Sequence, residues 1–296
     1  MVSKLKGPPP KELWQNIDRS ILPSFLRDLP PPPQEEQLSD DDDAVELKVA
    51  SFGGHGTLEA LEVTRILEEH GITCCICGTS ALIYYGAGRI RGDWEICVPS
   101  ALAQEAEALL KSEDHSRDYI TLPPWPIPWP GSLAHTYTRF RGRDIDFYFI
   151  LVPSDDVHLT VEPSNLQRSH HGLPYPRLDV LIQSLIEANN GNSLCDLVDG
   201  SDVSEEWGYE HLDLDGTTDQ AWAARKNKAI IESLDPFRAR FGGGIPVRPV
   251  QKRDMWRSVV TSKLQRLGWT TPESLFLTRF RLRGSPDPWL QPRDCS

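Results

Sequence analysis

The sequence lacks the features that define several large classes of protein. No hydrophobic stretch approaches the length of a membrane-spanning helix, so we expect no membrane partner. The first residues, MVSKLKGPPP, lack the apolar core of a signal peptide. The formal net charge is −12, and this acidic balance argues against long nucleic acid as a partner because such binding depends on clustered Lys and Arg.

Cysteine is scarce and poorly placed for crosslinks. Of the six cysteines, Cys74, Cys75 and Cys77 share one predicted strand, where neighbouring side chains point to opposite faces. That is poor geometry for a disulfide framework or a zinc site. We therefore expect reduced, mostly buried thiols in a cytoplasmic protein, and a nuclear location is the alternative.

Several catalytic motifs are also missing. The glycine-rich run 52–56 precedes a predicted helix but has no P-loop lysine, so we interpret it as a flexible entry loop. There is no Gly-x-Ser-x-Gly motif, no convincing Cys–His pair and no internal repeat. These absences leave acid-rich and glycine-rich segments as the candidates for a site.

The composition predicts three regions. Residues 1–49 form an N-terminal arm with one short helix over 11–22 and a disordered linker over 29–46, because proline and aspartate runs bury too little area to fold. A docking tail is the alternative for this arm. An α/β domain follows over 50–175, and a helical C-terminal region packs on it over 176–296.

The apolar patterning predicts an α/β (or α+β) fold, with a small mixed sheet flanked by helices. The expected central strand is 72–77, because it has few polar atoms. The expected helices cover 57–70, 79–85, 100–111, a segment starting at Pro176, 194–198, 218–234, 254–267 and 272–281. The other expected strands cover 93–98, 119–122, 135–141 and 144–152, with a tight turn at Gly142 between the last two.

A proline- and tryptophan-rich segment, PPWPIPWPG, interrupts this pattern over 123–131. Its prolines exclude a helix or a central strand. We favour a segment that covers a sheet edge, and a stiff lid is the alternative.

The richest stretch is GTSALIYYGAGRIRGDWEICV, over 78–98. Asp93 and Glu95 are two residues apart on a predicted strand, so they share a face while Trp94 points to the core. Two adjacent carboxylates repel one another unless a cation or solvent relieves them. A Gly-Thr-Ser turn that opens a helix is typical of phosphate binding. Together these features predict metal-assisted chemistry on a phosphate compound.

These motifs resemble the nucleotidyltransferase superfamily, which has the DNA polymerase beta-like fold. The resemblance rests on Cys77-Gly78-Thr79-Ser80 followed by Asp93-Trp94-Glu95-Ile96 and a later acidic strand, over residues 57–152. It is closest to small solitary members, including fungal proteins of unassigned role. It implies magnesium-dependent transfer of a nucleotidyl group from a nucleoside triphosphate such as ATP to a hydroxyl of a small molecule or a protein.

The resemblance assigns roles to three acids. Asp93 and Glu95 would be shared ligands of Mg²⁺. Asp146 would be the third acid and would help to remove the proton of the acceptor hydroxyl. Asp144 competes for this role, but we favour Asp146 because it lies deeper in the predicted strand, whereas Asp144 adjoins Arg143 and a turn.

The resemblance also assigns the nucleotide-binding residues. Gly78, Thr79 and Ser80 would approach phosphate through their backbone and hydroxyl groups, and Arg89 or Arg91 would clamp a phosphate oxygen. Thr79 and Gly92 depart from the residues common in the family. The alternative is therefore a catalytically degenerate relative that serves as a nucleotide-binding or protein-interaction module.

Overall fold

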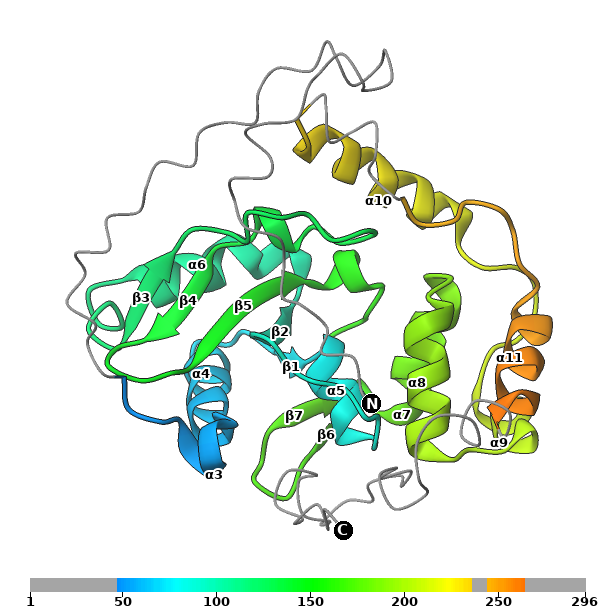
Figure 1. Cartoon of the computed structure of the whole chain (residues 1–296), viewed down its shortest axis with the longest axis horizontal. Coiled ribbons are helices and arrows are strands. Elements are labelled where there is room, and N and C mark those ends of the chain that lie inside the picture. The colour runs from blue at the N-terminus through cyan, green and yellow to red at the C-terminus, as the bar shows by residue number, and fades with distance from the viewer. Residues whose placement is uncertain (1–46, 236–243, 264–296) are drawn as a thin grey trace, which may run out of the picture. The chain divides into compact units, whose positions relative to one another are not determined.

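The computed structural model describes residues 47–235 and 244–263, which all belong to one compact unit of the chain (Figure 1). The predictions for the N-terminal arm, for the helix over 272–281 and for Cys295 lie outside the described residues.

The described residues form a five-stranded mixed sheet, which confirms the predicted α/β class. The strand order is β1-β2-β5-β4-β3. Strands β2 and β5 run parallel, and the other neighbouring pairs run antiparallel. The strands are β1 (Cys75–Ile76), β2 (Trp94–Val98), β3 (Tyr119–Leu122), β4 (Arg139–Gly142) and β5 (Tyr148–Pro153).

Strand β1 lies at an edge of this sheet, so the prediction of a central strand there is wrong. Its low polarity has another cause. A separate two-stranded sheet of β6 (Leu166–Arg168) and β7 (Pro174–Pro176) places β7 against β1. Both residues of β1 are therefore buried although one side of the strand has no sheet partner.

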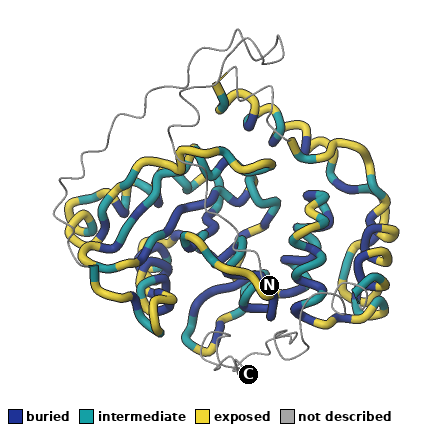
Figure 2. The backbone as a smooth tube through the Cα atoms, viewed as in Figure 1, coloured by how far each residue is buried: buried dark blue, intermediate teal, exposed yellow. Residues whose placement is uncertain are grey.

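The five-stranded sheet has two different faces. Trp94, Ile96 and Phe149 belong to a large core shared with the helices Thr57–Glu69 and Ala103–Lys111. The opposite face, which we call the cleft face, carries a smaller cluster that includes Cys97 and Ile150. The middle strands are buried along most of their length, whereas the loop over 123–131 is mostly exposed (Figure 2).

Three helices before residue 176 follow the predictions, namely α4 (Thr57–Glu69), α5 (Gly78–Tyr84) and α6 (Ala103–Lys111). A fourth, α3 (Ser51–Gly54), was not predicted, because the glycine-rich run 52–56 is interpreted from the sequence as a flexible loop. A 3₁₀ turn over Ser100–Leu102 precedes α6, so Ser100 does not cap that helix. Its hydroxyl instead accepts a hydrogen bond from the amide of Asp155, at 2.8 Å, which joins this turn to the end of β5.

The remaining described helices are α7 (Leu178–Glu187), α8 (Gly191–Ser201), α9 (Glu205–His211), α10 (Gln220–Ser233) and α11 (Lys252–Thr261). Helix α7 starts two residues later than predicted because Pro176 pairs with Leu166 in the small sheet. Helix α9 was not predicted, since its seven residues are too few to show a clear period.

The described cysteines bear out the prediction of free thiols. Cys74, Cys75, Cys77 and Cys97 are free and buried, and Cys195 is partly exposed. Cys75 lies directly opposite Cys97 across the β1–β2 pair. Burial raises the pKa of the Cys74 thiol, which keeps that side chain protonated and unreactive.

Candidate functional site

The predicted turn at Gly78 brings the start of α5 against Glu95. Gly78 has φ +55°, and a β-carbon there would lie 1.7 Å from Oε2 of Glu95. The amide of Thr79 donates a hydrogen bond to the same oxygen, at 3.0 Å. Position 78 therefore requires glycine for two reasons, the left-handed backbone and the close approach of a carboxylate.

Glu95 lines a cleft and is partly buried. Burial raises its pKa, the charge of Asp93 raises it further, and the hydrogen bond from Thr79 opposes both effects. The two carboxylates predicted to share a face thus lie close enough to interact. The sheet alternation places them opposite Trp94, as the sequence predicts.

Asp93 is already surrounded by donors from distant segments. Arg139 binds it through two hydrogen bonds, from Nε to Oδ2 at 2.7 Å and from a terminal nitrogen to Oδ1 at 3.1 Å. The indole of Trp125 donates to Oδ2 at 3.0 Å. The loop over 123–131 therefore reaches the predicted site through Trp125, and its other aromatic residue, Trp129, is 66% exposed.

Asp146 does not join the other two acids. Strand β5 begins at Tyr148, so the prediction that Asp146 lies within a strand is wrong. Residues 143–147 form the connection to β4, in which Asp144 adopts φ +60° and Ile145 bridges to Lys48. Asp144 and Asp146 are both exposed there. The β2–β5 register pairs Glu95 with Ile150, so an apolar residue stands beside it on the strand predicted to carry the third acid.

The predicted nucleotide-binding residues divide into two groups. Gly78, Thr79 and Arg89 line the cleft, and Arg89 forms an ion pair with Asp196 there, with its Nε 2.8 Å from the carboxylate. Ser80 is buried, and its hydroxyl has no hydrogen-bond partner among the described residues.

Arg91 turns to the opposite face of the sheet. Its guanidinium lies over the Trp94 ring, 4.0 Å from the centroid, and it donates to the carbonyl of His55. Burial lowers its pKa to about 10. In this arrangement it does not reach the cleft.

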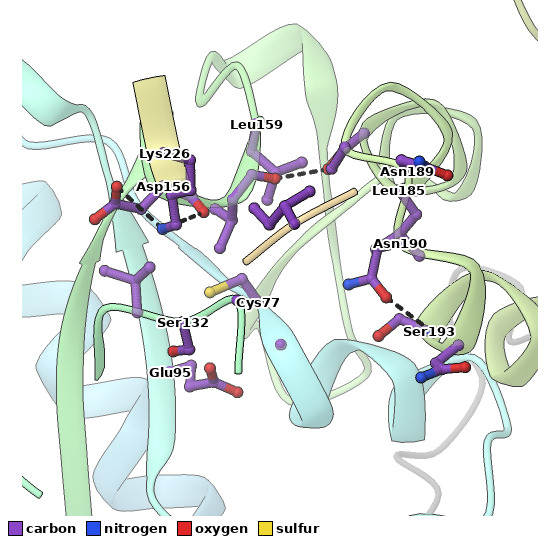
Figure 3. A pocket seen from close by; sticks show the side chains of 18 of the residues that line it. Cys77, Glu95, Ser132, Asp156, Leu159, Leu185, Asn189, Asn190, Ser193 and Lys226 are labelled. Atoms are coloured by element: carbon purple, nitrogen blue, oxygen red, sulfur yellow. Dashed lines mark hydrogen bonds and ion pairs between the residues drawn. The ribbon is translucent and has the colours of Figure 1, made fainter. Parts of the chain in front are cut away.

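The cleft has a volume of about 680 Å³ and lies between the cleft face of the sheet and the helices α7, α8 and α10. Figure 3 shows Glu95 and Cys77 on one side, with Asn190 and Ser193 on the other. The connection between α7 and α8 adds Asn189 to this second wall, and the first turn of α8 adds Asn192. A space of this size accommodates a nucleotide or a cofactor.

A buried lysine completes the cleft and was not identified from the sequence. Lys226 donates to the carbonyl of Asp156 at 2.9 Å and pairs with its carboxylate at 3.1 Å (Figure 3). Tyr137 donates to the same carboxylate. Burial lowers the pKa of Lys226, and the charge of Asp156 opposes this effect. The helical period could have indicated that Lys226 is buried, because it lies on the same face of α10 as the buried residues Trp222, Ala223 and Ile230.

In this arrangement the acids do not fit a magnesium ion. Both oxygens of Asp93 accept hydrogen bonds from Arg139, and Asp146 lies in a separate connection. Within the described ranges, no three His, Cys, Asp or Glu side chains gather closely enough to hold a metal. Magnesium binding by Asp93 and Glu95 would require Arg139 to leave.

The chain was compared with known families and proteins. No protein-family model matches it, and no curated protein matches it. The resemblance described above therefore rests on residues 57–152 alone. None of the helices in the described ranges is long and apolar enough to cross a bilayer.

The raised pKa of Glu95 leads to a prediction on stability. Because the pKa of Glu95 is raised in the folded state, its contribution to stability is present below the ordinary value of 4.5 and is lost as the pH rises through the folded-state pKa. We expect Glu95→Gln to stabilise the protein near pH 8 and to gain little near pH 4.5, measured by urea unfolding at both pH values. Glu69→Gln, at an exposed position on α4, is the control and is expected to show no such difference. An equal effect of Glu95→Gln at both pH values would contradict the prediction.

Proposed function

We propose that the cleft binds a nucleoside triphosphate such as ATP. The observation that carries this proposal is that the Gly78 turn and the ammonium of Lys226 line the same cleft of about 680 Å³. Phosphate groups are bound by backbone amides at the start of a helix together with a lysine or arginine. The side chains of Lys226 and Arg89 are groups of the second kind and line the cleft, together with Gly78 and Thr79.

Lys226 is suited to hold an anion. Its side chain is only 5% exposed, and the structure gives two acceptors for its three N–H donors, both on Asp156. A third donor is therefore available within the described part of the chain. The uncharged wall of Asn189, Asn190 and Ser193 supplies amide and hydroxyl groups that suit the base and ribose rather than another phosphate.

Binding of ATP is tested by isothermal titration calorimetry on the full chain. We expect Lys226→Met to weaken binding at least about tenfold, which corresponds to about 1.4 kcal/mol. The matched control is Lys228→Met on the same helix. This lysine is 76% exposed, and its ion pair with Glu232, at 3.8 Å, is long and exposed to solvent. The control is expected to bind like the wild type. No heat of binding with any of the four common nucleoside triphosphates would overturn the proposal.

Nucleotidyl transfer to a hydroxyl of a small molecule or protein is the second candidate. It is favoured by one observation, the proximity of Asp93 and Glu95 to the Gly78 turn. It is opposed by the contact of Arg139 with Asp93 and by the position of Asp146. We therefore favour the proposal that the chain is a nucleotide-binding module, related to nucleotidyltransferases but catalytically degenerate. Transfer of label from an α-labelled triphosphate to protein or small-molecule acceptors would instead favour nucleotidyl transfer over nucleotide binding alone.

A further inference from the structure

Asp93 is paired with an arginine of the same chain, whereas the resemblance implies that its carboxylate binds a metal ion. The Arg139 guanidinium makes two hydrogen bonds to its carboxylate. The Asp93 side chain is 9% exposed and that of Arg139 is 15% exposed. The guanidinium is therefore a counter-charge to the carboxylate at a largely enclosed position.

The fold holds this arginine from three sides. Strand β4 is paired with β5 in a register that sets Arg139 opposite Ile150, and Ile150 is in turn paired with Glu95. Arg139 therefore lies on the same face as the two acids. Its guanidinium is 3.8 Å from the Trp125 ring centroid and 5.5 Å from that of Tyr148. Both contacts are within the range of cation–π attraction.

Strand β5 itself contains no acidic residue that could act as a third metal ligand. Ile150 stands beside Glu95, and Trp94 is paired with Phe149, so Tyr148 is level with Asp93. A tyrosine and an isoleucine thus occupy the positions nearest to the two acids. Trp125 donates a third hydrogen bond to Asp93. The carboxylate therefore accepts hydrogen bonds from two residues, Arg139 and Trp125.

We propose that Arg139 is the permanent counter-cation of Asp93, and that the cleft binds its nucleoside triphosphate without a divalent metal. This inference rests on the proposed nucleotide binding. The triphosphate itself carries a high negative charge, and an unpaired Asp93 beside Glu95 would repel it. With Asp93 neutralised by Arg139, the cations that line the cleft are Lys226 and Arg89, and the triphosphate would share them with their present partners Asp156 and Asp196.

The first test is calorimetric titration of the full chain with ATP in excess EDTA and again in millimolar magnesium chloride. We expect dissociation constants that differ by less than about threefold, or about 0.65 kcal/mol. Binding that occurs only with magnesium would overturn this inference and leave the proposed function standing. Absence of binding under both conditions would overturn the proposed function and this inference with it.

The second test removes the arginine. Arg139→Gln is expected to weaken binding in EDTA at least about tenfold, because Asp93 then repels the triphosphate, and magnesium should restore binding. The double variant Asp93→Asn/Arg139→Gln should recover binding in EDTA, since neither charge remains. Arg177→Gln, which breaks an exposed ion pair with Asp179, controls for the loss of one positive charge.

The double variant also separates this role from a merely structural one. If Arg139→Gln acted only by loosening the sheet, adding Asp93→Asn would not recover binding, and that result would overturn the proposal. Equal binding by Arg139→Gln and the wild type in EDTA would overturn it as well. Circular dichroism melting of each variant identifies any that fails to fold, and in that case the comparison of EDTA with magnesium on the wild type decides.

Discussion

Gly78→Ala is expected to abolish nucleotide binding and to destabilise the protein by about 3 kcal/mol. The backbone at φ +55° costs about 1–2 kcal/mol for a residue with a β-carbon. That β-carbon would also lie 1.7 Å from Oε2 of Glu95, so Glu95 or the start of α5 must move. Overpacking of this kind costs about 1–3 kcal/mol. Urea unfolding and ATP calorimetry measure the two effects.

Gly71→Ala separates the two causes. Gly71 has φ +76°, and a β-carbon there would meet no atom within 4 Å. The free energy of unfolding of this variant is expected to fall by about 1–2 kcal/mol, the cost of the left-handed backbone alone. The variant should bind ATP like the wild type. If Gly71→Ala and Gly78→Ala proved equally destabilising, the clash with Glu95 would be absent and the assigned geometry of the turn would be wrong.

Gly200→Ala is expected to destabilise the protein by about 3 kcal/mol through a different contact. Gly200 lies on α8, and its β-carbon would stand 2.5 Å from the amide nitrogen of Ala87 and 2.9 Å from the carbonyl oxygen of Tyr85. These are backbone atoms of the turn after α5, so no side-chain rotation relieves the clash. Helices α8 and α5 must separate, which also changes the shape of the cleft that both line.

Gly191→Ala on the same helix is the matched control. Its β-carbon would meet only the terminal methyl of Met255, at 3.8 Å, an ordinary contact. We expect a change in unfolding free energy within about 0.5 kcal/mol. Thermal and urea unfolding measure both variants. A Gly200→Ala protein as stable as the control would show that α8 does not pack on the turn as described.

Local patterns in the sequence were sufficient to predict much of the fold. The period of α4, the strand over 119–122 and the sharing of a face by Asp93 and Glu95 are all present in the structure. Each depends on residues that are close in the chain, where the helical period or the strand alternation sets the direction of a side chain. The resemblance to nucleotidyltransferases uses the same short-range information, and it stays a prediction.

The site needed contacts that no local pattern contains. Asp146 belongs to a connection rather than to a strand, because Ile145 bridges to Lys48, which is far away in the chain. The edge position of β1 could not be predicted from its composition. Strand β7 buries β1, and a buried edge strand is as apolar as a central one. Composition records how much of a strand is buried, but it does not record which neighbour buries it.

The sequence by itself determined which residues are acidic, which share a face and where the backbone requires glycine. Only the tertiary structure decided what neutralises those acids. Asp93 and Arg139 are 46 positions apart, and they meet because β4 pairs with β5 in one particular register. Lys226 enters the cleft because α10 packs its buried stripe toward Asp156. Charge is a property of single residues, whereas the pairing of charges depends on how distant segments pack together.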